Sequence, residues 1–212
     1  MSSEDITTDD VWEIEVDGAQ VRLRRLTKPE WLTLVDLGNK SGGIDQEEAT
    51  VAFARIATSA IVSPTPAADV VAAYPGVPIR VVRILSAVAR GERVRDADRL
   101  GVDPFVPIDP DALSALKAKE QVWTFDVGTC SDAIVVRRLN STEFKALQSK
   151  LDAGNSRRSY VAMERALRDV LRYPASTELD DIVARYPAVA VRVVEDLQRI
   201  ANGDRLEHAK KA

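Results

Sequence analysis

An internal duplication constrains the fold of this chain more than any other feature of its sequence. Four sequence blocks in the first half recur in the same order in the second half, at offsets between 110 and 113 residues. The paired blocks are VWEIEVDGAQV and VWTFDVGTCSDAIVV, the two Arg-Arg-Leu triplets, VAFARIATSAIVSP and VAMERALRDVLRYP, and YPGVPIRVVRILSAVARGE and YPAVAVRVVEDLQRIANGD. An ordered set of this kind is typical of repeated structural units. We therefore predict two tandem copies of one unit, residues 11–92 and 122–204.

Three segments lie outside the two predicted copies. Residues 1–10 form an acidic leader, and residues 205–212 form a short C-terminal tail. Residues 93–121 carry several prolines, which is typical of an extended and semi-rigid linker. Within this linker, Asp109-Pro110 precedes a run of good helix formers and predicts a short helix just before the second copy.

A β-hairpin opens each copy. Apolar and polar residues alternate on both sides of Asp17-Gly18, a dipeptide that strongly favours a two-residue hairpin turn. In the second copy the same alternation surrounds residues 128–132, which we expect to form a longer loop in place of the turn. The hairpin is thus kept in both copies while its connection changes.

About four helices follow the hairpin in each copy. A hydroxyl or amide cap with a glutamate three positions later, Thr27 with Glu30 and Asn140 with Glu143, predicts the start of the first helix. Apolar residues spaced three or four apart predict the amphipathic helices after it, and we expect Gly38 and Gly154 to give the first helix of each copy a left-handed end. The predicted helices lie near residues 27–38, 45–63, 67–73 and 78–91, and near residues 140–154, 157–172, 179–185 and 187–203. The fold class is therefore α+β, with two tandem repeats that each contain a β-hairpin and about four helices.

A unit of this size is marginally stable by itself. A domain of roughly eighty to ninety residues buries only about 60–65% of the surface of its unfolded chain, and a two-stranded ribbon is weak alone. We therefore expect either that the two copies pack on each other or that the chain self-associates through its small sheets.

Charge and composition exclude several classes of function. The 29 basic against 33 acidic residues give a net charge of −4, which provides no basic field for nucleic acid. The longest uncharged stretch, residues 56–68, is too short to span a bilayer, and the acidic N-terminus does not resemble a secretory signal. A single cysteine, Cys130, excludes an internal disulfide and fits a reducing compartment such as the cytoplasm.

Candidate catalytic residues are scarce, so we expect no enzymatic activity, no cofactor and no metal. His208, the only histidine, lies near the C-terminus, where a positioned general base is not expected. The acidic pairs Glu47-Glu48 and Asp180-Asp181 could hold Mg²⁺, but each is predicted in the first turn of a helix, where negative charge complements the helix dipole. Gly42-Gly43 lacks the lysine and hydroxyl residue that complete a phosphate-binding loop.

Six residues are candidates for contact with a protein partner. They occupy corresponding places in the two copies: Trp12, Arg24 and Arg25 in the first, and Trp123, Arg137 and Arg138 in the second. Strand alternation directs one arginine of each pair to solvent, where it suits an acidic partner, and tryptophans are common anchors at interfaces. The alternative interpretation is structural, with salt bridges for the arginines and core packing for the tryptophans.

Each copy resembles, over nearly its whole length, the tail assembly chaperones of long-tailed bacteriophages. That family has a strand pair reading roughly V-D-G-x-x-V-x-L-R-x-P-T-R-x-E before a helical remainder. The matching residues of the first copy are Val16, Asp17, Gly18, Val21, Arg22, Leu23, Arg24, Thr27 and Glu30, whereas Leu26 stands where the family often has proline. The second copy keeps Val136, Arg137, Arg138 and Glu143 and loses the Val-Asp-Gly triplet.

The resemblance implies a task in virion morphogenesis. Such chaperones coat the helical tape measure protein, hide its apolar faces and help tail-tube subunits to assemble around it. The sequence is similarly compatible with the baseplate hub assembly proteins of contractile-tailed phages. From the resemblance we expect tape measure, hub or baseplate subunits as partners and the host cytoplasm as location. The alternative is a permanent structural component of the virion tail or baseplate.

Overall fold

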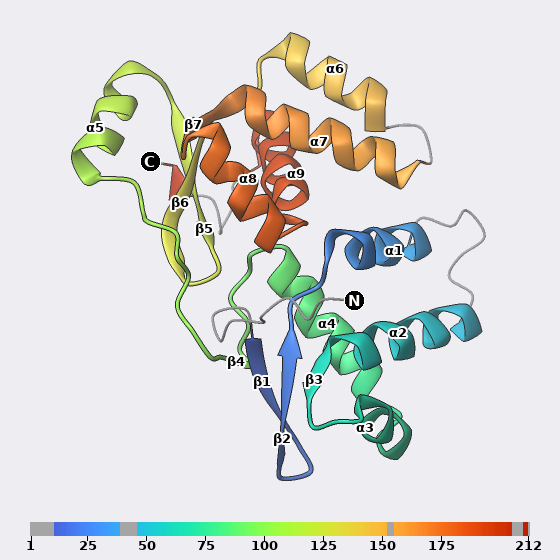
Figure 1. The fold of residues 1–212 in the computed structure, drawn as a ribbon. Coiled ribbons are helices and arrows are strands. Elements are labelled where there is room, and N and C mark those ends of the chain that lie inside the picture. Colours follow the sequence, from blue (N-terminus) through green and yellow to red (C-terminus); the bar gives the residue numbers. More distant parts are fainter. Residues whose placement is uncertain (1–10, 39–45, 152–154, 205–209, 212) are drawn as a thin grey trace. The chain divides into compact units, whose positions relative to one another are not determined.

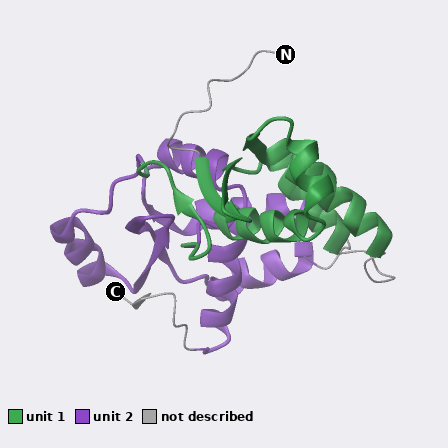
Figure 2. Ribbon diagram, turned by 90° about the horizontal axis from the view of Figure 1, so that it is seen from below, with its two compact units in different colours: residues 1–89, 93–103 green, residues 90–92, 104–212 purple. Residues whose placement is uncertain are grey.

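The computed structural model describes residues 11–38, 46–151, 155–204 and 210–211, and the chain divides into two compact units (Figure 2). Unit 1 comprises residues 1–89 and 93–103, and unit 2 comprises residues 90–92 and 104–212. The segment predicted as a linker is therefore divided between the units, with most of it in unit 2.

Unit 1 contains a four-stranded antiparallel sheet (Figure 1). Strands β1 (Val11–Val16) and β2 (Ala19–Arg24) pair around Asp17 and Gly18, whose φ values of 51° and 77° suit the predicted two-residue turn. Strand β3 (Ile61–Ser63) adds to β2, and strand β4 (Asp98–Arg99) adds to β1. The predicted hairpin is confirmed, but the outer strands were not predicted, because β3 and β4 are too short to show an alternating pattern.

The helices of unit 1 are α1 (Lys28–Gly38), α2 (Gln46–Ala60), α3 (Ala67–Ala73) and α4 (Val77–Ala89). The predicted capping box at α1 is confirmed: the Thr27 N–H donates to Glu30 Oε2 at 2.9 Å and the Glu30 N–H donates to Thr27 Oγ1 at 3.4 Å. Helix α2 ends earlier than predicted because residues 61–63 join the sheet as β3. Gly38 ends α1 without the left-handed conformation that we predicted.

Unit 2 contains a second four-stranded antiparallel sheet, formed by β5 (Val122–Val127), β6 (Cys130–Arg137), β7 (Leu171–Tyr173) and β8 (Lys210–Lys211). The predicted five-residue loop over 128–132 was wrong. Val127 pairs with Cys130, so the turn is only Gly128-Thr129, and the extra residues form an irregularity inside β6. There Asp132 has a φ of 50° and its N–H donates to Asp126 Oδ1 at 3.0 Å.

The helices of unit 2 are α5 (Pro110–Lys119), α6 (Ser141–Leu151), α7 (Ser156–Val170), α8 (Ser176–Arg185) and α9 (Val189–Ala201). The cap predicted for α5 is confirmed, because Asp109 Oδ1 accepts the N–H groups of Asp111 and Ala112 at 2.9 and 3.1 Å. The capping box of α6 is confirmed as well, with Asn140 and Glu143 bonded reciprocally at 2.9 Å.

The order of elements is the same in both units from the hairpin onward: two strands, two helices, one strand, two helices and a final strand. The strand orders, β3-β2-β1-β4 and β7-β6-β5-β8, correspond as well. In both units the second helix of the block packs against the fourth, as α2 on α4 and α7 on α9. The predicted α+β class is confirmed, whereas the two tandem copies of one structural unit stay a prediction.

Several predictions concern residues outside the described ranges. These are the acidic leader 1–10, Gly42-Gly43, Gly154, His208 and most of the tail 205–212. Among the described residues, no single helix is long and apolar enough to cross a bilayer. Helices α3 and α4 pass that test of length and composition only when taken together, and they are bent by 117° relative to each other.

Candidate partner-binding site

The two candidate tryptophans lie in the protein core. Trp12 and Trp123 each occupy the second position of the first hairpin strand, β1 or β5, and each is only 6% exposed. The Arg99 guanidinium lies 5.4 Å from the centre of the Trp12 ring, so this ring also receives a cation within its own unit. Their placement agrees with the structural interpretation, core packing, because neither side chain is presented to a partner in this structure.

The first arginine of each pair forms an internal clamp. Arg24 Nη1 and Nη2 donate to the two carboxylate oxygens of Glu30 at 2.9 and 2.7 Å. Arg137 binds Glu143 in the same bidentate manner at 2.7 and 2.6 Å. Each guanidinium also donates to the carbonyl oxygen of the following residue, at 2.8 and 2.9 Å. The clamp joins the end of the second hairpin strand to the first turn of the next helix, which accounts for Arg24 and Arg137 structurally.

The clamps also set the charge state of the two glutamates. Burial opposes ionisation of Glu30, but hydrogen bonds from Arg24 and from the Thr27 backbone outweigh it and lower the pKa of this carboxyl from 4.5 to about 2. Hydrogen bonds from Arg137 likewise lower the pKa of Glu143 from 4.5 to about 2 despite its partial burial. Both carboxylates are therefore ionised at neutral pH, as a capping box with an arginine partner requires.

The second arginines, Arg25 and Arg138, differ in exposure. Arg25 is half-buried, whereas Arg138 is exposed and its Nη2 donates to the carbonyl oxygen of Ala201 at 3.3 Å. Of the six candidate residues, Arg138 is therefore the one on an open surface. It lies beside α6, which is the least covered helix of the α6–α9 block and has Leu147 as its single buried residue.

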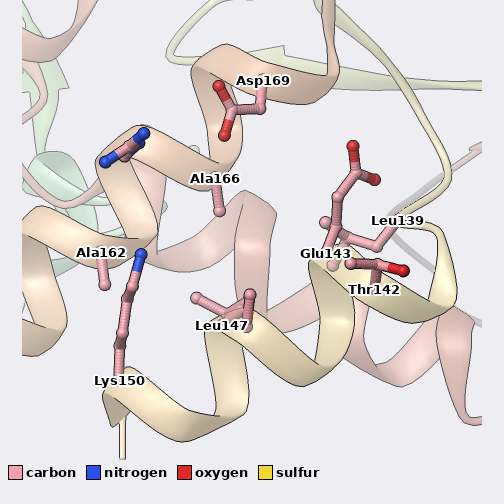
Figure 3. A pocket seen from close by; sticks show the side chains of 10 residues that line it. Leu139, Thr142, Glu143, Leu147, Lys150, Ala162, Ala166 and Asp169 are labelled. Carbon is pink, nitrogen blue, oxygen red and sulfur yellow. The ribbon is translucent and has the colours of Figure 1, made fainter.

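A hollow of about 220 Å³ lies between α6 and α7 (Figure 3). Its apolar part comes from leucine and alanine side chains, and charged side chains of both signs surround it. In Figure 3 the α6 side chains Leu147 and Lys150 rise toward α7. The lining residues are Leu139, Thr142, Glu143, Ala146, Leu147, Lys150, Ala162, Arg165, Ala166 and Asp169.

A second hollow of about 490 Å³ lies at the start of the same helix. It is lined by Arg138, Leu139, Asn140, Ser141, Phe144, Lys145 and Ala201. Leu139 borders both hollows, so one lies at the start of α6 and the other follows the helix as far as Lys150. We call this region, α6 with its two hollows, the α6 surface. Its apolar side chains and mixed charges suit a protein segment better than a small polar ligand.

Sequence reasoning found only part of the α6 surface. Arg138 was among the predicted contact residues, but the hollows were not predicted. Phe144, Leu147 and Leu151 form the apolar stripe of the amphipathic helix predicted near residues 140–154, yet only Leu147 is fully buried and Phe144 lines a hollow. The available signal was the large share of polar residues in α6, which is typical of a helix with most of its surface in solvent. In the structure α6 packs mainly against α7.

The two acidic pairs lie in helices α2 and α8. Among the described residues, no group of three or more histidine, cysteine, aspartate or glutamate side chains is placed to hold a metal ion. Glu47-Glu48 lies in the first turn of α2, as predicted. Asp180-Asp181 does not lie in a first turn, because α8 begins at Ser176, and Asp180 pairs with Arg168 at 2.5 Å.

Comparison with known proteins adds no relative: no protein-family model, no curated protein and no solved structure matches this chain.

Proposed function

We propose that this chain is a non-enzymatic protein of phage tail or baseplate morphogenesis that acts by protein–protein contacts. Within that class we propose a tail assembly chaperone that binds the tape measure or hub. Two observations support the proposal. The first copy contains the strand-pair motif that resembles this family, and unit 2 presents the α6 surface to solvent.

The chemistry of the α6 surface fits an amphipathic helix. Phe144, Ala146 and Ala166 offer accessible apolar atoms, and Lys150 and Asp169 offer opposite charges at the border of the hollow. A helix with an apolar stripe flanked by charges can bury the stripe there and pair its charges with both signs. A tape measure protein, being long and helical, has such stripes, and a chaperone that covers them keeps them from aggregating.

Co-purification with a tagged tape measure or hub protein tests the proposal. Ala146 is exposed and lines the α6–α7 hollow, so Ala146→Arg should block the hollow without disturbing the core. Ala115→Arg on the exposed face of α5 is the matched control, because it adds the same side chain to a helix elsewhere on unit 2. We expect the wild-type chain and the control to retain the partner and the Ala146 variant to lose it. Absence of any complex with tail proteins would refute the proposal.

The second candidate function, a permanent component of the tail or baseplate, rests on the same resemblance. Mass spectrometry of purified particles separates the two functions. A chaperone is expected to be missing from finished virions, whereas a structural component is expected in stoichiometric amounts.

A further inference from the structure

Residues 90–92 follow α4 along the chain but are seated within unit 2, on the β5–β6 turn and α9. The carbonyl oxygen of Gly91 accepts hydrogen bonds from the Gly128 N–H at 2.8 Å and from Arg192 Nη1 at 3.0 Å. A Cβ atom on Gly91 would lie 3.1 Å from Val127 Cγ1, and the φ of Gly91 is 69°. We call the surface of the β5–β6 turn and α9 that residues 90–92 cover the unit 2 seat. Position 91 requires glycine, because its backbone lies close to Val127 and has a positive φ.

Unit 1 has the same backbone seat at the corresponding residues. Arg80 corresponds to Arg192 at an offset of 112 residues and donates to the Glu15 carbonyl oxygen at 2.7 Å. Arg192 makes the equivalent bond to the Asp126 carbonyl oxygen and adds the bond to Gly91. Arg80 is therefore held beside the β1–β2 turn by a hydrogen bond to β1, as Arg192 is held beside the β5–β6 turn by a hydrogen bond to β5.

This part of unit 1 is largely exposed, although the Tyr74 hydroxyl donates to Asp17 Oδ2 of the turn at 2.8 Å. Tyr74 is 37% exposed, whereas its counterpart Tyr186 is 2% exposed and contacts the ring of Phe105, with the ring centres 6.1 Å apart. Ile79, in the first turn of α4, is 61% exposed. We call the β1–β2 turn together with Ile79, Arg80 and Arg83 of α4 the unit 1 seat.

The chain contains a second segment of the type that fills such a seat. Residues 202–204 follow α9 as residues 90–92 follow α4, with glycine at the same place. Gly203 has a φ of 92°, but a Cβ atom there would meet nothing within 4 Å, and all three residues are exposed. The segment also has a positive φ at its glycine, and among the described residues no atom lies within 4 Å of a Cβ built there.

The charges on the segment and on the seat both differ between the two units. In unit 2, Arg90 bridges Glu92 and Glu195 at 2.8 and 3.1 Å, which places these two carboxylates near one another. The counterparts of Arg90, Glu92 and Glu195 are Asn202, Asp204 and Arg83. Residues 202–204 thus lack the arginine that residues 90–92 have, and the unit 1 seat has an arginine, Arg83, where unit 2 has Glu195. Arg83 pairs with Asp96 at 3.2 Å and Asp204 lies 3.8 Å from Arg199, but all four side chains are more than half exposed. Asp204 and Arg83 can therefore exchange these partners for each other at a contact.

We propose that residues 202–204 of one copy dock on the unit 1 seat of a second copy, so that the chain assembles head to tail. In the docked segment the Gly203 carbonyl oxygen would accept hydrogen bonds from Arg80 and from the backbone N–H of Asp17. The Asp204 carboxylate would pair with Arg83. Because the contact uses different surfaces on the two copies, it continues from copy to copy and forms a ring or filament. The inference concerns the protein alone and does not rest on the proposed tail function.

Sedimentation velocity of the full-length chain with a charge-swap pair tests the inference. Because a contact of this size is weak, the measurement runs from about 10 µM to about 1 mM. Arg83→Glu and Asp204→Arg each place like charges at the contact and should weaken association about tenfold or more. Lys117→Glu, on the exposed face of α5, is the control for a change of charge and should associate as the wild type does.

An equimolar mixture of the two variants provides the decisive measurement. In the mixture each seat meets a segment of opposite charge, so association should return although neither variant associates alone. Restoration also shows that both variants are folded. A wild-type chain that stays monomeric over the whole range, a variant that associates as well as the wild type, or a mixture that associates no better than its parts would overturn the inference.

Discussion

The Arg137–Glu143 clamp leads to a quantitative prediction for Glu143→Gln. A carboxyl whose pKa falls from 4.5 in the unfolded chain to about 2 in the folded protein stabilises the fold by at most about 3 kcal/mol at neutral pH. The two side chains are 22% and 25% exposed, and solvent screening reduces the expected effect to about 1–2 kcal/mol. We therefore expect Glu143→Gln to lower the free energy of unfolding by that amount at pH 7.

The pH dependence distinguishes the clamp from a general loss of packing. Because the folded pKa lies below the unfolded value, the carboxylate stabilises the protein above pH 4.5 and loses its effect as pH falls from 4.5 toward 2. Urea unfolding followed by circular dichroism should therefore show the wild type and Glu143→Gln converging over this interval. The same behaviour is expected for Glu30→Gln in unit 1.

Glu178→Gln is the matched control for this experiment. Glu178 also accepts a backbone N–H at the start of its helix, that of Ala175 at 3.1 Å, so the variant loses a cap. We expect a loss of only about 0.5–1 kcal/mol, in the range of an ordinary capping interaction. A Glu143→Gln effect no larger than that of the control, or one that is equal at pH 7 and pH 3, would refute the reasoning.

Three further predictions concern single sites. Leu23→Ala removes a side chain with 0% exposure and should cost about 2–5 kcal/mol in urea unfolding, so a cost under about 1 kcal/mol would contradict its place in the core. Gly18→Ala meets no atom within 4 Å but has a φ of 77°, so it should cost about 1 kcal/mol through the backbone alone. Asp109→Ala removes the cap of α5 and should speed amide hydrogen exchange in α5 by about fivefold, for a loss of about 1 kcal/mol; unchanged exchange would show that the cap contributes little.

The hairpins and helix starts could be predicted because they depend on neighbouring residues. Asp17-Gly18 specifies its turn through backbone conformations that few residue pairs adopt, and the structure has the turn there. The capping boxes at Glu30 and Glu143 are hydrogen bonds across three residues, so their sequence pattern nearly determines their geometry.

The outer strands and the β6 irregularity could not be predicted. Strands β4 and β8 contain two residues each, and β3 and β7 contain three. Segments of this length carry no measurable periodicity, and they become strands only because a hairpin edge lies beside them. The extra residues of the second hairpin could enter the turn or the strand, and the sequence pattern does not distinguish these two solutions.

The candidate site shows the same division. Both tryptophans and both first arginines were correctly placed at the hairpin, but their burial and their glutamate partners depend on helices that follow later in the chain. Helices α6 and α9 both carry apolar stripes, yet α9 has six buried residues and α6 has one. The difference arises from the number of elements that pack around each helix.

The sequence by itself determined the order of the hairpins and helices, the capped helix starts at Thr27, Asp109 and Asn140, the hairpin turn of unit 1 and the correspondence between the two halves. These features follow from hydrogen bonds and periodicities that span only a few residues. Only the tertiary structure decided which corresponding surfaces are covered: the seat filled by residues 90–92 in unit 2 is open in unit 1, although the local sequences correspond. Burial depends on which distant segment lies against a surface, and that is a property of the assembled chain.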